Sequence, residues 1–232
     1  MELLWTGFLK AVEMLLSFDQ EVFHITWLTI QVCFISTFIS TVIGVPSGMF
    51  LCFCNFRLKK FVVLLVHAGM GLPPVVAGLW VSMLLWRSGP LGHLGWMFTT
   101  QAIVIAQVLV SLPIIISLTY SAFNKIDKTL IFQIKSLAPT KIQSLIIYTK
   151  EARFGIMAAI MAGLGRVLAE VGAAMMVGGN LRGETRILTT SMVMEVSRGN
   201  FHIAMALSFI LMALAIMITF ILLQIQQRRM VT

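Results

Sequence analysis

Charged side chains are scarce in this chain of 232 residues. They make up 11% of the sequence, against roughly 25% in an average soluble domain, while hydrophobic residues make up 59%. This balance excludes an ordinary soluble domain and indicates a membrane protein. Cysteine is rare as well. Cys33 and Cys52 fall in one apolar stretch and Cys54 directly follows it, so we expect all three to be small hydrophobic residues. The four histidines are scattered singly, so no metal site is predicted.

Two further absences narrow the function. The sequence contains no G-x-x-x-x-G-K-[ST] motif, so we do not expect the chain to hydrolyse ATP itself. It offers no grouping of a nucleophile or of metal ligands, which argues against a membrane enzyme. The net charge of +8 comes from basic residues in short segments between apolar stretches, an arrangement that does not indicate nucleic-acid binding.

Five apolar stretches are long enough to cross a bilayer, which requires roughly 20 apolar residues in a helix. Four of them carry no charge, and one contains Arg166 and Glu170. The stretches are Ile25–Phe53, Phe61–Trp86, Ala102–Tyr120, Phe154–Val177 and Ile203–Leu223. We therefore expect an all-α polytopic membrane protein with about five transmembrane helices.

Lysine and arginine residues predict the orientation, because short loops rich in them stay in the cytoplasm. Eleven lie in the segments after spans one, three and five, and five lie in the segments on the other side. This asymmetry predicts an N-terminus outside and a C-terminus in the cytoplasm. Residues 1–22 form an amphipathic segment expected on the outer face, either on the membrane surface or docked against the spans. Residues 23–232 are expected to form a single transmembrane domain.

The fourth span carries two ionisable side chains, Arg166 and Glu170, four residues apart. Its small residues fall on the same helical face as Arg166, and they are Gly155, Ala159, Ala162, Ala169 and Ala173. Small residues permit close helix packing in lipid, so Arg166 should face other protein or a water-filled path. The two groups could form a structural ion pair on one helical turn. Alternatively, Arg166 could bias a translocation path toward an anion while Glu170 holds its geometry.

Two other segments are candidate functional elements. Pro73 and Pro74 remove two backbone donors inside the second span, which predicts either a simple kink or a bend that shapes a gate. The loop 178–186 has turn chemistry and mixed charge from Arg182, Glu184 and Arg186. It is expected to be either solvated surface or a docking site for an outer partner.

The segment 121–153 contains two amphipathic helical runs separated by Pro139, which predicts a helix, a sharp corner and a second helix. Such a hairpin could lie on anionic lipid, or it could dock onto a cytoplasmic protein that covers its apolar stripe. The residues at and around the corner are Leu137, Ala138, Pro139, Thr140, Lys141 and Ile142. The apolar side chains of Leu137 and Ile142 are the expected contacts.

Several blocks of sequence together resemble a known transporter family. The most specific block runs from Glu151 to Gly155 and from Gly165 to Asn180, with support from residues 70–76, 87–92 and 189–199. These blocks are similar to the membrane-spanning permease subunits of ATP-binding-cassette (ABC) importers, above all those for tungstate and molybdate. In such permeases a cytoplasmic coupling motif begins with Glu-Ala-Ala and has a glycine four residues after the last alanine. Here those positions hold Phe132-Gln133-Ile134 and Ala138.

The resemblance implies a division of labour between subunits. A homodimer would form the path for the oxyanion, which agrees with an odd number of spans that cannot make two equal inverted halves. A cytoplasmic ATPase dimer would bind the hairpins and use the ATP, so this chain would hold no cofactor. An extracytoplasmic binding protein would deliver tungstate, or molybdate or another oxyanion such as sulfate.

The implied location is the prokaryotic plasma membrane, as a multi-pass protein in contact with lipid. A stand-alone channel is the alternative from another functional class. It would need no cytoplasmic partner, and the long amphipathic hairpin argues against it.

Overall fold

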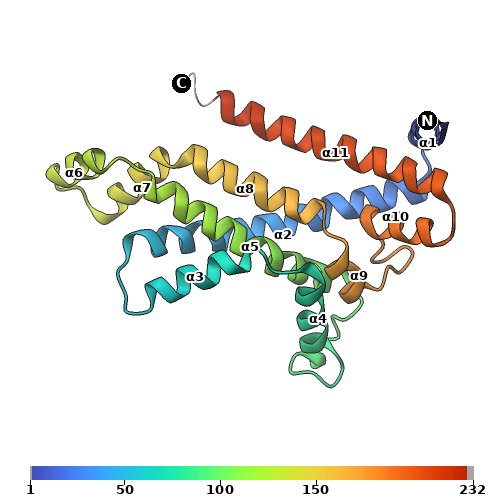
Figure 1. Ribbon diagram of the computed structural model, residues 1–232, viewed down its shortest axis with the longest axis horizontal. Helices are drawn as coiled ribbons and strands as arrows, with labels where there is room; N and C mark the ends of the chain where they lie inside the picture. The colour runs from blue at the N-terminus through green and yellow to red at the C-terminus, as the bar shows by residue number, and fades with distance from the viewer. Residues whose placement is uncertain (1, 229–232) are drawn as a thin grey trace.

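The computed structural model describes residues 2–228, and over this range the chain is entirely helical apart from its connections (Figure 1). The helices are α1 Glu2–Leu16, α2 Gln20–Phe53, α3 Lys59–Gly69, α4 Pro74–Leu85, the 3-10 helix Gly92–Leu94 (η1), α5 Thr100–Asn124, α6 Lys128–Ser136, α7 Lys141–Glu151, α8 Arg153–Leu168, α9 Gly172–Gly178, α10 Leu188–Ser197 and α11 Phe201–Arg228. The prediction of an all-α membrane protein is confirmed.

Three helices, α2, α5 and α11, are each long and apolar enough to cross a bilayer. The pairs α3–α4 and α8–α9 would bring the number of spans to five if each pair is one span. However, the members of these pairs meet at 106° and 58°. The bend between α3 and α4 agrees with the kink or bend predicted at Pro73 and Pro74, whereas the expectation of one continuous helix over Phe154–Val177 is wrong.

The two bends have different local causes. Pro73 and Pro74 cannot donate backbone hydrogen bonds, so α3 ends before them and α4 begins at Pro74, where a missing donor costs nothing. No proline accounts for the second bend. There, α8 ends at Leu168, and the side chain of Glu170 supplies an acceptor for the start of α9.

The centre of the bundle is formed by α5, which packs against both α2 and α8. Polar contacts pin α2 to α5 inside the bundle, where Ser36 Oγ donates to Gln107 Oε1 at 2.7 Å. Close approach depends on Gly48, because a Cβ there would lie 2.8 Å from the backbone oxygen of Ile116. Small and hydroxyl residues at helix contacts are typical of proteins that pack in lipid.

The N-terminal helix α1 packs on the first half of α11. A Cβ at Gly7 would lie 2.6 Å from Met205 Cβ, and the Phe8 and Phe209 rings meet edge to face. Residues 1–22 were expected either on the membrane surface or docked against the spans, and α1 is docked against the span α11. Its position on the outer face stays a prediction.

The two ends of the long axis carry different elements (Figure 1). The α6–α7 hairpin lies at one end, and α10 and the junction between α1 and α2 lie at the other. Helix α11 runs from the second end toward the first.

Candidate functional site

The break between α8 and α9 is organised by Glu170. Its side chain is buried, with the residue only 2% exposed, and Oε1 accepts a hydrogen bond from the Ala173 amide at 2.6 Å. The carboxylate thus satisfies a free donor in the first turn of α9. The backbone oxygen of Glu170 accepts from Thr189 Oγ1 at 2.9 Å, which ties the break to α10.

The break between α3 and α4 leaves a backbone carbonyl without a helical partner. This carbonyl belongs to Leu72, and it accepts a hydrogen bond from Arg166 Nη2 at 3.3 Å. The Arg166 Nε is buried and has no hydrogen-bond partner within residues 2–228. A single guanidinium therefore joins the two breaks and keeps unused donor capacity there.

The segments that follow the two breaks are in van der Waals contact. A Cβ at Gly78 in α4 would lie 2.7 Å from Ala173 Cα in α9. A Cβ at Gly172 would lie 2.8 Å from Val75 Cγ2. Helices α4 and α9 thus need glycine at their crossing, and the two bent pairs form one packed unit.

The structure corrects the predicted relation between Arg166 and Glu170. Helix α8 ends between them, and none of the four ion pairs among the described residues joins them. Arg166 and Glu170 do not lie on one continuous helix, because α8 ends at Leu168 and the chain bends there. Arg166 instead contacts a neutral carbonyl, and Glu170 caps α9.

The predicted small-residue face of the fourth span is divided by the bend. Ala159 and Ala173 are buried, whereas Ala162 and Ala169 are exposed. The neighbouring Gly165 is also exposed, and a Cβ there would meet nothing within 4 Å. Beside Arg166, α8 therefore presents a face of small side chains that the described part of the chain does not cover.

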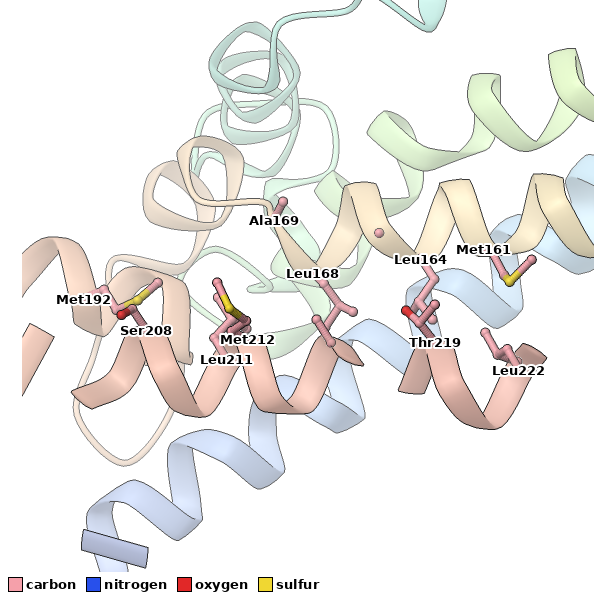
Figure 2. A pocket seen from close by; sticks show the side chains of 12 residues that line it. Met161, Leu164, Leu168, Ala169, Met192, Ser208, Leu211, Met212, Thr219 and Leu222 are labelled. Atoms are coloured by element: carbon pink, nitrogen blue, oxygen red, sulfur yellow. The ribbon is translucent and has the colours of Figure 1, made fainter. Parts of the chain in front are cut away.

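An apolar groove of about 340 Å³ lies between α8, α10 and α11 (Figure 2). Its lining includes Leu164, Leu168 and Met212, and its polar side chains are the hydroxyl groups of Ser208 and Thr219. Removing an oxyanion from water requires charged or multiple polar partners. This groove does not offer them, whereas the region of the two breaks holds the guanidinium group of Arg166.

The hairpin has the predicted form of helix, corner and helix. Thr140 Oγ1 accepts from the Gln143 amide, and Gln143 Oε1 accepts from the Thr140 amide, which makes a capping box at the start of α7. Leu137 is 82% and Ile142 70% exposed. Ala138, which stands at the glycine position of the resembling coupling motif, has a φ of 45°, a conformation that glycine favours.

The arginines of the loop 178–186 are held by an acidic residue that sequence reasoning missed. Arg182 Nη2 and Arg186 Nη1 donate to the two carboxylate oxygens of Glu21, at 2.5 and 2.9 Å. Glu184 is exposed. Arg186 is only 8% exposed, so the interpretation of this loop as solvated surface is wrong at that position. The one feature of the sequence that could have indicated this contact is Glu21 itself, an acidic residue in the first turn of α2.

Comparison with known proteins gives two relatives over nearly the whole chain and one over about two thirds of it. The tungstate uptake system permease protein TupB of Peptoclostridium acidaminophilum is 34% identical over 227 residues, covering 98% of this chain and 100% of that protein. TupB of Campylobacter jejuni is 34% identical over 223 residues, covering 95% and 92%. The molybdenum transport system permease protein ModB of Azotobacter vinelandii is 27% identical over 167 residues, covering 68% and 74%.

The fold is also found among solved structures. A chain of the MetNI methionine ABC transporter in an inward-facing conformation superposes with a TM-score of 0.75 at 20% identity, covering 91% of this chain and 97% of that chain. At this identity the likeness concerns the fold alone. No protein-family model matches the chain.

Proposed function

The chain belongs to the family of ABC-transporter permease subunits that includes the tungstate uptake permeases, and on that premise we propose that it forms the path of a tungstate importer. The observation that carries the proposal is similarity over nearly the whole chain to proteins named for tungstate uptake. The geometry adds a place for the chemistry, because two interrupted spans meet at one arginine.

The region of the two breaks suits an anion path for a physical reason. Irregular backbone at membrane depth is tolerated only where it is buried in protein or lines a cavity. In secondary transporters, interrupted helices recur where the substrate binds. We assign to Arg166 the attraction of the oxyanion, to Glu170 the fixing of the α8–α9 break, and to Pro73 and Pro74 the bend of a gate.

The partners are part of the same proposal. Two copies of the chain form the path on their two-fold axis, with the N-terminus outside and the hairpin in the cytoplasm of a prokaryotic cell. The ATPase covers the exposed side chains of Leu137 and Ile142, whose apolar surface has no partner among the described residues. Around them, Ala138, Pro139, Thr140 and Lys141 form the corner. The oxyanion-binding protein docks at the opposite end, near the loop 178–186.

The substrate is tested in cells that lack the permease gene. Complementation with this chain should restore intracellular tungsten, measured by elemental mass spectrometry after growth in nanomolar tungstate. An empty vector and an uptake-dead ATPase variant are the controls. Restored tungsten that is independent of the ATPase would favour a stand-alone channel and contradict the proposal.

Molybdate transport is the second candidate, because ModB of Azotobacter vinelandii is a relative over two thirds of the chain. The two oxyanions have similar size and charge. The same cells supplied with equal concentrations of both distinguish them. A cellular tungsten-to-molybdenum ratio below that of the medium would assign the chain to molybdate.

A further inference from the structure

A polar cavity of about 330 Å³ is lined by residues of elements at the end of the molecule opposite the hairpin. Figure 1 shows where these elements lie. The cavity is bounded by the junction of α1 and α2, the loop before α10, and the junction of α10 and α11. Its charged lining residues, which define the outer cavity, are Asp19, Glu21, Arg182, Arg186, Glu195 and Arg198. It is separate from the apolar groove beside α8 and shares no lining residue with it.

The carboxylates of the outer cavity differ in how many arginines they neutralise. Glu195 is occupied by two donors, Arg198 Nη1 at 3.2 Å and Asn200 Nδ2 at 2.7 Å. Asp19 Oδ1 caps the start of α2 by accepting from two backbone amides. Glu21, by contrast, is shared by two guanidinium groups. The local excess of positive charge therefore lies at the pair of arginines that Glu21 holds.

Arg186 is the buried member of that pair. Its side chain is 10% exposed, whereas those of Glu21 and Arg182 are 39% and 73% exposed. The Arg186 Nε is buried and finds no hydrogen-bond acceptor in the part of the chain that the structure describes. A guanidinium presents its donors in a planar fork that suits a carboxylate with two oxygens. Glu21 uses only one nitrogen of this fork.

We propose that the outer cavity receives a carboxylate side chain of the extracytoplasmic binding protein, which binds Arg186 in exchange for Glu21. This inference rests on the proposed importer function. Glu21 acts as an internal ligand that occupies the arginines until the binding protein docks, and its exposure leaves it free to turn toward water. A free oxyanion with two charges is a poorer occupant, because Asp19, Glu21 and Glu195 would repel its two charges more strongly than the single charge of a carboxylate.

The test compares two substitutions that remove the same charge. Glu21→Gln frees the arginines, whereas Glu13→Gln removes an exposed carboxylate of α1 that pairs with Lys10 and does not line the cavity. The affinity of the tungstate-loaded binding protein for the permease–ATPase complex is measured in nanodiscs. Glu21→Gln should tighten binding about two- to fivefold, the size expected for a partly exposed ion pair. Glu13→Gln should leave it unchanged.

A second variant changes the arginine of the Glu21–Arg186 ion pair. Arg186→Lys keeps a positive charge for Glu21 but loses the planar fork, so binding should weaken about tenfold. Arg87→Lys, an exposed arginine outside the cavity, is the matched control. Intact co-purification of the ATPase with each variant shows that the fold is kept.

The outcomes separate the two proposals. If wild-type complex binds the binding protein but Glu21→Gln weakens binding or equals Glu13→Gln, the exchange is refuted and the importer function stands. If the wild-type complex fails to bind the binding protein at all, the importer function fails and this inference fails with it.

Discussion

The separation of Arg166 from Glu170 makes a quantitative prediction about their coupling. A buried ion pair that loses one partner costs about 3–5 kcal/mol, because the other charge is left buried and unpaired. In this structure Arg166 donates to the Leu72 carbonyl and Glu170 accepts from the Ala173 amide, so each has a contact that does not involve the other. We therefore expect Arg166→Gln and Glu170→Gln to have nearly additive effects on stability.

The individual magnitudes follow from the hydrogen bonds. Glu170→Gln keeps an acceptor oxygen for Ala173 and loses the assistance of the charge, which should lower the free energy of unfolding by about 1 kcal/mol. Arg166→Gln loses one hydrogen bond of 3.3 Å, a change of similar or smaller size. The coupling between the two substitutions should be below about 1 kcal/mol.

The assay combines unfolding with transport. The free energy of unfolding is measured in mixed detergent micelles for wild type, both single variants and the double variant. Tungstate uptake is measured at matched membrane expression. Arg166→Gln should lose uptake with the fold intact, and the double variant should not regain it. A coupling of 2 kcal/mol or more, or full uptake by the double variant, would show a structural ion pair and refute the assignment of Arg166 to the path.

Three further predictions follow from packing, exposure and charge. Gly78→Leu should lower the free energy of unfolding by about 1–3 kcal/mol, because its Cβ would lie 2.7 Å from Ala173 Cα. Gly165→Ala should raise the free energy of unfolding by about 0.5–1 kcal/mol, because a Cβ at that position meets open space. Denaturant titration measures both changes. Leu137→Asp should release the ATPase while Ala138→Gly, which suits the positive φ, should retain it; equal co-purification of both would exclude the corner as the docking element. Single cysteines are introduced near Arg182 or near Lys141 in a cysteine-free variant of the protein. In intact cells an impermeant thiol reagent should label the cysteine near Arg182 and not the one near Lys141, and the reverse pattern would contradict the predicted orientation.

Much of the fold was predictable because its signals are local. The spans α2, α5 and α11 are apolar over a length that only a membrane helix requires, and Pro139 marks the corner of the hairpin. Pro73 and Pro74 predicted a bend, although not one of 106°. The break after Leu168 has no proline, and apolar periodicity continues across it, so a continuous helix was the natural expectation.

The contacts of the candidate site could not be predicted for a different reason. Arg166 binds the carbonyl of Leu72, 94 residues away, and a backbone oxygen leaves no mark in the sequence. Glu21 and Arg186 are separated by 165 residues, and each is unremarkable in its own segment. Such partners are decided by how the bent spans pack, which local patterns do not encode.

The central claim, that this chain forms the path of an ATP-driven tungstate importer, is tested most directly in proteoliposomes. They contain the permease and its ATPase, with ATP on the ATPase side and the tungstate-loaded binding protein on the other. We predict that tungsten accumulates against its gradient only when ATP and the binding protein are both present. Molybdate should compete more strongly than sulfate. Tungstate flux that equilibrates without ATP, or the absence of any flux with all components present, would contradict the account.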